Sequence, residues 1–301
     1  MEYAIDVRGL TKSFGNQIVL DGIDIAVPAG TIHAVLGPNG AGKTTLINAL
    51  TTLARPDSGS ASVNGYDVVT QAADVRRRIS VTGQYAAVDD VLTARENLRM
   101  MAGLLGLKRP AARERTEQLL ERFTLTAAAG KRVSTFSGGM RRRLDLAISL
   151  ICSPPIIFLD EPTTGLDTRS RRALWDEVER LRNDGVTILL TTQYLDEADT
   201  LADMISVLDR GRVVASGTPS RLKAQVGSDV VEVRDEHGDV IHEVHTDGTP
   251  RDVVRVLSTV PDGNVGTVTI RRPTLDDVFL SVTSDSGTEH SSTRPLEGVA
   301  S

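Results

Sequence analysis

The sequence has few of the features that mark membrane-spanning or secreted proteins. Its 301 residues contain no run of 18 or more apolar residues. The best candidate, residues 144–159, is interrupted by polar residues and by Pro154 and Pro155, so we predict no transmembrane helix. The N-terminal residues 1–6 have no long apolar core, and we expect no signal peptide. The single cysteine, Cys152, excludes a disulfide within the chain and fits a reducing cytosol; we interpret it as a small core residue.

An excess of basic charge is also missing. The chain has 34 Lys and Arg against 40 Asp and Glu, for a net charge of −6. Residues 227–301 hold 14 acidic and 6 basic residues, a net of −8, so the rest of the chain is close to neutral. Neither part is suited to neutralise a phosphate backbone, and we predict no nucleic-acid partner. Four of the five histidines lie in the acidic part, but their irregular spacing favours surface histidines over a metal site.

The most informative stretch, residues 34–45, is an apolar strand that runs into a glycine-rich loop ending in Lys-Thr. This pattern is typical of a phosphate-binding P-loop, because glycines let consecutive N–H groups converge and the following helix adds its dipole. Lys43 would reach the β- and γ-phosphates, and the Thr44 hydroxyl would complete a Mg²⁺ shell. A plain strand-to-helix turn is the alternative, which the full pattern disfavours. The residues expected to bind the nucleotide here are Gly37, Pro38, Asn39, Gly40, Ala41, Gly42, Lys43, Thr44 and Thr45.

A second pattern places two carboxylates after four apolar residues, in residues 156–161. The apolar run predicts a strand buried on both faces of a parallel sheet, and ligands bind at the carboxyl end of such strands. Asp160 is placed to hold the Mg²⁺, and Glu161 to orient and polarise an attacking water. Two adjacent acids at the end of a buried strand are costly without a cation, which favours a functional interpretation. The next buried strand, residues 186–190, leads to Gln193.

Three further features have two interpretations each. Ser137, Gly138 and Gly139 come just before a helix with arginines in its first turn. Basic residues oppose the helix dipole there and indicate a nearby anion, although an ordinary capped helix start fits equally well. Phe14 could stack on a purine ring or serve as a packing residue. Gln84 stands at the end of a predicted strand and is unremarkable by itself.

The order of these elements predicts an α/β protein. Residues 3–27 alternate as a small antiparallel sheet with turns at 15–16 and 21–22, and residues 89–155 form a largely helical insertion. We divide the chain into an α/β domain at residues 1–226, a small α+β domain at 227–283 and a tail at 284–301. We expect the tail to be disordered because it has scarcely an apolar residue. Within the small domain the patterns predict strands at 230–233, 241–244 and 267–270 and a helix at 252–257.

With these residues aligned, the chain resembles the ATP-binding subunit of ABC transporters over roughly residues 3–225. The resemblance implies a P-loop NTPase fold, the ABC ATPase, with an antiparallel β subdomain and a helical subdomain. It also implies ATP and Mg²⁺ as ligands. The matching motifs are Phe14 for the adenine-stacking aromatic, 37–45 for Walker A, Gln84 for the Q-loop and a metal ligand, 136–140 for the signature, 156–161 for Walker B, and 165–167, with Asp167, for the D-loop.

In this family two domains pair head to tail, so the resemblance implies a homodimer in the ATP-bound state. Ser137, Gly138 and Gly139 of one chain would touch the γ-phosphate bound by the other, and Asp167 would lie at the same site. Lys43 and Glu161 would be catalytic, and Gln193 would stand where the family usually has a histidine that senses the γ-phosphate.

Two departures narrow the resemblance to exporter ATPases of the daunorubicin-resistance type. Met140 replaces the usual Gln of the signature, and Gln193 replaces the usual His. Residues 273–280 match a C-terminal motif of that branch. The resemblance implies a subunit that hydrolyses ATP and powers efflux of a hydrophobic compound or antibiotic through a separate integral membrane subunit, while attached peripherally to the cytoplasmic face of the cell membrane. A soluble ABC-type ATPase that acts on nucleic acid or the ribosome is the alternative.

Overall fold

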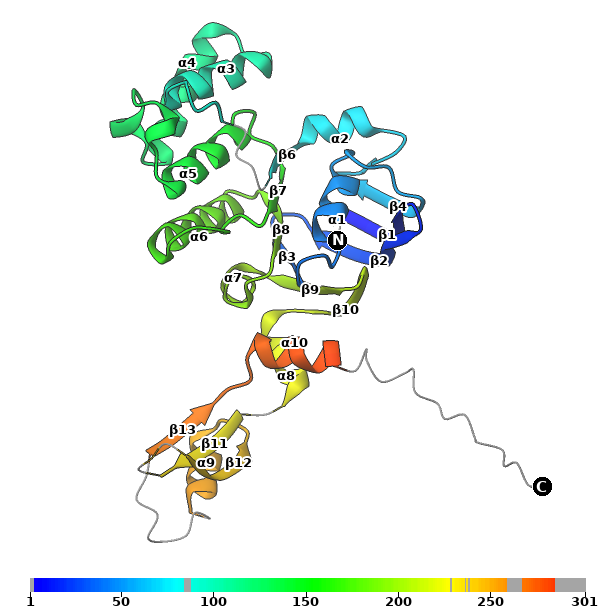
Figure 1. Cartoon of the computed structure of the whole chain (residues 1–301), viewed down its shortest axis with the longest axis vertical. Helices are drawn as coiled ribbons and strands as arrows, with labels where there is room; N and C mark the ends of the chain where they lie inside the picture. The colour runs from blue at the N-terminus through cyan, green and yellow to red at the C-terminus, as the bar shows by residue number, and fades with distance from the viewer. Residues whose placement is uncertain are drawn as a thin grey trace, which may run out of the picture. The chain divides into compact units, whose positions relative to one another are not determined.

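The computed structural model describes residues 3–83, 88–227, 229–235, 237, 239–258 and 267–284. The chain forms two compact units, which divide between Ser216 and Gly217 and are drawn in Figure 1. This division falls before the domain limit expected at 226/227. The reason is that helix α8 (Pro219–Val226) packs against helix α10 (Leu275–Ser284) of the second unit.

The first unit contains a four-stranded sheet in the order β2-β1-β4-β5. The antiparallel pairing predicted for residues 3–27 is confirmed, and so is the turn at 15–16. The turn predicted at 21–22 is wrong: Gly22 lies inside β2 with a φ of 69°. There, Asp21 and Gly22 of β2 lie opposite the single residue Thr11 of β1, which makes a β-bulge instead of a turn. The strands are β1 (Tyr3–Phe14), β2 (Gln17–Pro28), β4 (Ser58–Val63) and β5 (Tyr66–Asp67).

A six-stranded sheet in the order β10-β9-β3-β8-β7-β6 forms the centre of the unit. Neighbouring strands from β9 through β6 are parallel, and every residue of β3, β7 and β8 is buried. This confirms the strand predicted from the apolar run at 156–160, with Phe158 fully enclosed. The strands are β3 (Ile32–Leu36), β6 (Ile79–Thr82), β7 (Ile156–Asp160), β8 (Thr187–Thr192), β9 (Met204–Asp209) and β10 (Arg212–Gly217).

Helices accompany this sheet and form a separate group on its β6 side (Figure 1). The helical insertion predicted in the chain is present as α3 to α5 with two short 3₁₀ turns. Thr93 and Glu96 form a capping box that begins α3. The helices are α1 (Lys43–Leu50), α2 (Ala72–Arg78), α3 (Ala94–Leu104), α4 (Arg109–Arg122), α5 (Gly138–Ser149), α6 (Thr168–Asn183) and α7 (Leu195–Leu201), with 3₁₀ turns η1 (Thr126–Ala128) and η2 (Val133–Thr135).

Cys152 is exposed, so its interpretation as a core residue is wrong. The apolar run that suggested burial is divided between two elements, α5 and β7. Cys152 lies in the turn between them, just before Pro154 and Pro155, where the chain reverses at the surface.

The second unit has an antiparallel sheet in the order β12-β11-β13, which confirms the three predicted strands; α9 confirms the predicted helix. The sequence patterns missed α8 and α10. The motif at 273–280 in fact begins α10: Thr274 and Asp277 cap its first turn through reciprocal hydrogen bonds of 2.9 and 3.3 Å. The new elements are β11 (Asp229–Arg234), β12 (Val240–Thr246), β13 (Thr267–Arg271) and α9 (Pro250–Leu257).

Among the helices of the described ranges, none combines the length and the apolar character that a bilayer crossing requires.

The buried His33 makes a pH-dependent contribution to stability. It lies in β3, 2% exposed, with Nε2 2.9 Å from the Ser206 hydroxyl of β9. Burial lowers the pKa of His33 from 6.5 to about 4. Between these values the unfolded chain binds a proton that the folded chain does not, so this contribution is complete above pH 6.5 and is lost as the pH falls toward 4.

We therefore expect His33→Gln to flatten the acid side of the stability curve. At 1.36 kcal/mol per pKa unit, the native histidine accounts for roughly 3 kcal/mol of stability lost across this window. Glutamine can still bond Ser206 and does not titrate. Urea unfolding of both proteins at several pH values from 7 to 4 measures the difference between their free energies of unfolding. In this difference the contributions of the acidic residues that both proteins share cancel. Parallel curves would show that His33 does not contribute in this way.

Candidate functional site

The parallel sheet brings three polar strand ends to one edge. Leu36 at the end of β3 pairs with Thr192 at the end of β8, and Asp160 at the end of β7 pairs with Thr191. The residues that follow, Gly37, Gln193 and Glu161, leave the sheet side by side. A cleft of about 460 Å³ opens there. It is lined by Val19, Asn39, Gly40, Gly42, Lys43, Thr44, Thr45, Glu161, Thr164 and Gln193.

The loop between β3 and α1 has positions that only glycine fits. A Cβ on Gly37 would lie 2.2 Å from the Leu208 carbonyl oxygen, and one on Gly42 would lie 2.8 Å from the Val19 oxygen. Gly42 has a φ of 109° at the N-cap of α1, with no side-chain cap. The first turn of α1, which lines the cleft, therefore has no side-chain cap for its N–H groups, and this suits an anionic ligand.

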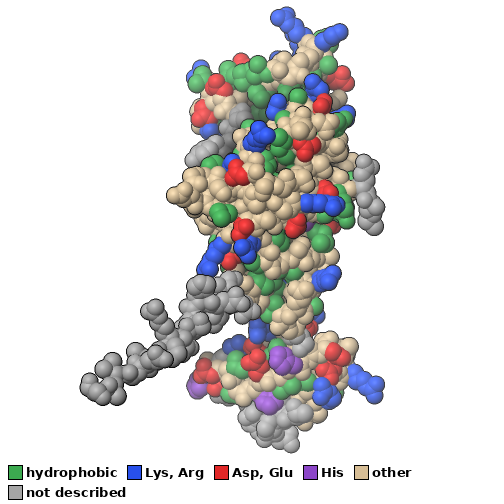
Figure 2. All heavy atoms as spheres, turned by 90° about the vertical axis from the view of Figure 1, so that its right-hand side faces the viewer, with side chains coloured by type: hydrophobic (Ala, Val, Ile, Leu, Met, Phe, Trp, Pro, Cys, Tyr) green, Lys and Arg blue, Asp and Glu red, His purple; other side chains and the backbone are tan. Residues whose placement is uncertain are grey.

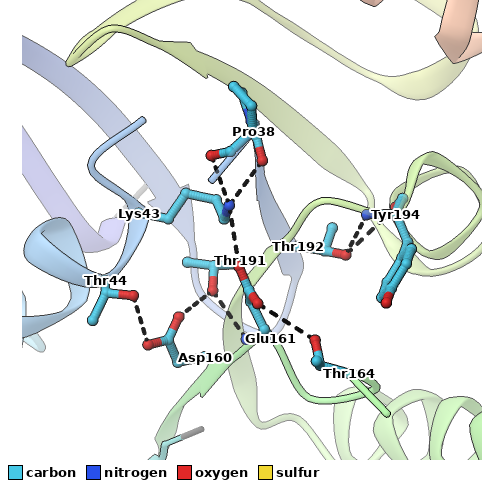
Figure 3. Close-up of polar contacts among 10 residues, drawn as sticks. Pro38, Lys43, Thr44, Asp160, Glu161, Thr164, Thr191, Thr192 and Tyr194 are labelled. Atoms are coloured by element: carbon cyan, nitrogen blue, oxygen red, sulfur yellow. Dashed lines mark hydrogen bonds and ion pairs between the residues drawn. The ribbon is translucent and has the colours of Figure 1, made fainter. Parts of the chain in front are cut away.

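Lys43 is the buried cation of the cleft, with a side chain only 5% exposed. Its ammonium donates to the carbonyl oxygens of Gly37, at 2.8 Å, and Pro38, at 3.1 Å. It also forms an ion pair with Glu161 Oε1 at 3.1 Å, as Figure 3 shows. A polyphosphate in this cleft would compete with Glu161 for the same ammonium.

Asp160 is 4% exposed and held from two sides. The Thr44 hydroxyl donates to Oδ2 at 3.0 Å and the Thr191 hydroxyl to Oδ1 at 2.6 Å. The structure thus brings together two of the three side chains expected to bind Mg²⁺, Thr44 of α1 and Asp160 of β7 (Figure 3). A hydroxyl and a carboxylate are the oxygen ligands that Mg²⁺ takes in phosphate sites, so the donor set fits this ion. Sequence reasoning did not single out Thr191, whose buried position on β8 depends on strand order.

Glu161 has an unusual backbone conformation. Its φ is 46°, in the left-handed region that non-glycine residues rarely adopt. Its N–H donates to the Thr191 carbonyl and is also 3.1 Å from the Thr191 hydroxyl. The Thr164 hydroxyl donates to Oε2 at 3.4 Å. Strained residues persist where surrounding contacts fix them and often occur at active sites. No sequence pattern indicated this strain.

Glu161, Gln193 and six of the nine expected loop residues line the cleft; Gly37, Pro38 and Ala41 of the loop do not. Phe14 is not among the lining residues either: the residue is 57% exposed at the end of β1, with the Lys12 ammonium 5.4 Å from its ring centroid. Gln84 lies outside the described residues. The lining also lacks Ser137, Gly138, Gly139 and Asp167.

Within the chain, Ser137 and Asp167 are helix caps. Ser137 accepts from Met140 N at 3.3 Å to begin α5. Asp167 accepts from Ser170 N and Oγ at 2.9 and 2.7 Å to begin α6, and these bonds lower its pKa. The two helix starts meet closely, because a Cβ on Gly139 would lie 2.3 Å from Ser170 Oγ.

The anion predicted near the α5 arginines is found within the protein itself. Arg141 pairs with Asp90, and Arg142 pairs with Asp145 at 3.1 Å. The start of α5 is thus capped in the ordinary way, and two of its three arginines, Arg141 and Arg142, pair with carboxylates of the same chain.

The segment after Gln193 is held by contacts with β8 and α6. Tyr194 N donates to the Thr192 hydroxyl at 2.9 Å (Figure 3), and the Arg171 guanidinium lies 4.9 Å from the Tyr194 ring centroid. Glu197 is fully buried in α7 and accepts from Trp175 Nε1 at 3.1 Å. Burial raises the pKa of Glu197.

Comparisons with known proteins agree with this geometry. The family model described as ABC transporter matches residues 20–164. The chain is 48% identical to the daunorubicin resistance ATP-binding protein DrrA3 of Streptomyces coeruleorubidus, over 94% of this chain and 96% of the relative. It is 46% identical to the daunorubicin/doxorubicin resistance ATP-binding protein DrrA of Streptomyces peucetius, over 98% and 96%. A solved ATP-binding subunit of an ABC transporter is 31% identical and superposes with a TM-score of 0.66, over 74% of this chain and 92% of its own.

Proposed function

Since this chain belongs to the ABC transporter family, as an ATP-binding subunit with ATPase chemistry, we propose that it powers efflux of a hydrophobic compound or antibiotic through a separate membrane subunit. One observation carries the catalytic part of this proposal. Lys43 and Glu161, from segments far apart in sequence, line one cleft together with the glycine-rich loop, and Asp160 accepts a hydrogen bond from Thr44 of the same lining. The drug-resistance relatives, which match nearly the whole chain, support the transport part.

Nucleotide binding is assigned to the loop and its helix. Residues 37–45 surround the phosphates, with N–H groups and the Lys43 ammonium as donors. Thr44 and Asp160 would hold Mg²⁺, which would neutralise phosphate charge. Adenine stacking is assigned to Phe14, an aromatic residue that is 57% exposed at the end of β1. Gln84 is proposed as a further metal ligand.

Hydrolysis is assigned to Glu161 and Gln193. The Glu161 carboxylate lines the cleft and accepts the proton of an attacking water, while Gln193 donates to the γ-phosphate from the end of β8. In this structure the Lys43 ammonium pairs with the Glu161 carboxylate. When ATP is bound, Lys43 would pair with phosphate and release Glu161. Substrate binding would thus free the carboxylate to act as the base.

A second chain completes the site in this proposal. Ser137, Gly138, Gly139 and Asp167 do not line the cleft of their own chain. They contact the γ-phosphate bound by the partner in a head-to-tail homodimer. The N-cap position of Ser137 supports this assignment, because Ser137, Gly138 and Gly139 then form the positive end of α5, where an anion is bound favourably.

The cargo passes through the membrane subunit, to which this chain attaches at the cytoplasmic face. The second unit has a regulatory or dimer-stabilising role. An ATPase acting on nucleic acid is disfavoured: on the face of the first unit in Figure 2, basic and acidic side chains are interspersed, whereas a nucleic-acid backbone requires a continuous basic surface.

We expect Lys43→Ala to abolish ATP binding, and Glu161→Gln to retain binding while hydrolysis falls about 100-fold or more, because only the second keeps the phosphate contacts. ATP should then hold Glu161→Gln as a dimer on gel filtration. Glu114→Gln, an exposed change on α4, is the matched control and should behave as wild type. Near-normal hydrolysis by Glu161→Gln would refute the role given to this carboxylate.

Gln193→Ala should slow hydrolysis about tenfold or more with a smaller effect on Mg-ATP affinity, because one hydrogen bond to a charged phosphate oxygen is lost. Gln193→His should keep activity and gain a dependence on pH between about 6 and 7, as imidazole titrates there. ATPase rate against pH for the three proteins measures both effects. If Gln193→Ala matched the native enzyme at every pH, Gln193 would not be the sensor.

Transport requires the membrane partner. Cells that express this chain with a co-purifying membrane protein should accumulate less daunorubicin, followed by its fluorescence, than cells with either protein alone. The chain should sediment with membranes only when that partner is present. The pair with Glu161→Gln should not lower accumulation. Reduced accumulation by this chain alone, or equal accumulation in all strains, would contradict the proposed export.

A further inference from the structure

Arg142 is a buried side chain outside the cleft that joins α5 to the central sheet. The residue is 9% exposed. Its Nε donates to the Pro162 carbonyl at 2.8 Å, and its Nη1 donates to the Gly83 carbonyl at 2.7 Å. Nη1 also donates to Asp145 Oδ2 at 3.1 Å on the same helix. One planar guanidinium therefore ties the helix that follows Ser137 to two strand ends.

Both carbonyls belong to segments next to the proposed chemistry. Pro162 directly follows Glu161, and Gly83 lies between the end of β6 and Gln84. Since proline has no N–H, the carbonyl is the only backbone group through which Pro162 can be held by hydrogen bonds. The strained Glu161 is thus fixed on one side by Thr191 and on the other by Arg142.

The charge of Arg142 is balanced by carboxylates from several elements. Burial lowers its pKa, and Asp145, Glu197 and Asp160 oppose this shift. These acids lie on α5, α7 and β7. A shift of the guanidinium would break its hydrogen bonds to Asp145 and to the two carbonyls in a buried environment, which is costly.

The neighbouring arginines do not make this connection. Arg141 pairs with Asp90 and reaches the Val133 carbonyl, at 3.4 Å. Arg143 donates to the Phe123 carbonyl at 3.1 Å. These partners all belong to the helical part of the unit. In the contacts of the described residues, Arg142 is the one of the three that crosses to the sheet.

We propose that Arg142 is a positioning residue for hydrolysis: it holds the Glu161 turn in place and makes that turn follow the position of α5. The start of α5 is the segment assigned to contact the γ-phosphate bound by the partner. When the dimer closes and α5 moves, Arg142 would therefore move the turn that carries Glu161, the proposed base. This inference rests on the proposed function, through the role of Glu161, and deepens it. Arg142 itself contacts neither nucleotide nor water in this mechanism.

The test compares Arg142→Gln and Arg142→Lys with Arg115→Gln in the full chain bound to its membrane subunit. Arg115 is a matched control: its guanidinium also holds backbone carbonyls, Leu150 O at 2.6 Å and Ile151 O at 3.2 Å, after the other end of α5. Both Gln variants remove a guanidinium that is hydrogen-bonded to the carbonyls of a turn. Only in Arg142→Gln is that turn the one next to Glu161.

We expect Arg142→Gln to lower kcat about tenfold or more while Mg-ATP affinity changes less than about threefold, because small misplacement of a catalytic group costs rate more than binding. Arg115→Gln should keep kcat within about twofold of wild type. Arg142→Lys retains the charge but not the planar set of guanidinium donors. Compared with Arg142→Gln, it should therefore restore thermal stability more than kcat. If Arg142→Gln does not fold, the kcat of Arg142→Lys tests the inference. A kcat in the Arg142 variants no lower than in Arg115→Gln would overturn the inference.

A second measurement does not depend on activity. Amide hydrogen exchange of the chain without nucleotide should rise at Glu161, Thr163, Thr164 and Gly83 in Arg142→Gln, and at 151–153 in Arg115→Gln. An inactive wild-type complex would refute the proposed function, and exchange would still decide whether Arg142 fixes the Glu161 turn. An active wild type with unchanged exchange at Glu161, Thr163 and Thr164 in Arg142→Gln would refute the inference alone.

Discussion

The parallel register of β3, β8 and β7 is the constraint on which the site depends. Leu36 pairs with Thr192 and Asp160 with Thr191, so three chain segments distant in sequence leave the sheet at the same edge. A slip of one residue between neighbouring strands would turn the Asp160 side chain to the other face. The complete burial of the three strands fixes the register. The packing of the apolar sheet thus fixes the positions of the polar side chains at the cleft.

The buried charges of the site are each compensated by groups from another element. Lys43 faces Glu161, Asp160 accepts from Thr44 and Thr191, and Arg142 donates to two carbonyls. Removing one partner of a buried pair typically costs about 3 to 5 kcal/mol. For such a site, exchange of partners costs less than separation of the charges. A polyphosphate that takes Lys43 from Glu161 is an exchange of this kind.

Predictions succeeded where one local pattern dominated. The apolar run at 156–160 could only be buried, and it forms β7. Alternation identified the strands of the second unit. Predictions failed where a signal had two structural meanings. The Asp21-Gly22 pair, a common turn sequence, is a bulge because β2 continues to pair on both sides. Cys152 stood in an apolar run that two different elements share, and it is exposed.

The sequence by itself determined the chemistry: a glycine-rich loop ending in Lys43 and Thr44, two carboxylates after a buried strand, and Gln193 after another. Spacing along one segment suffices for that, because each motif is local. Only the tertiary structure decided which groups meet. The contacts that decide this join residues 20 to 59 positions apart in the sequence. They are the hydrogen bonds of Thr191 with Asp160 and with the strained Glu161, and those of Arg142 with Pro162 and Gly83. Such contacts follow from strand order and helix packing, which no local pattern encodes.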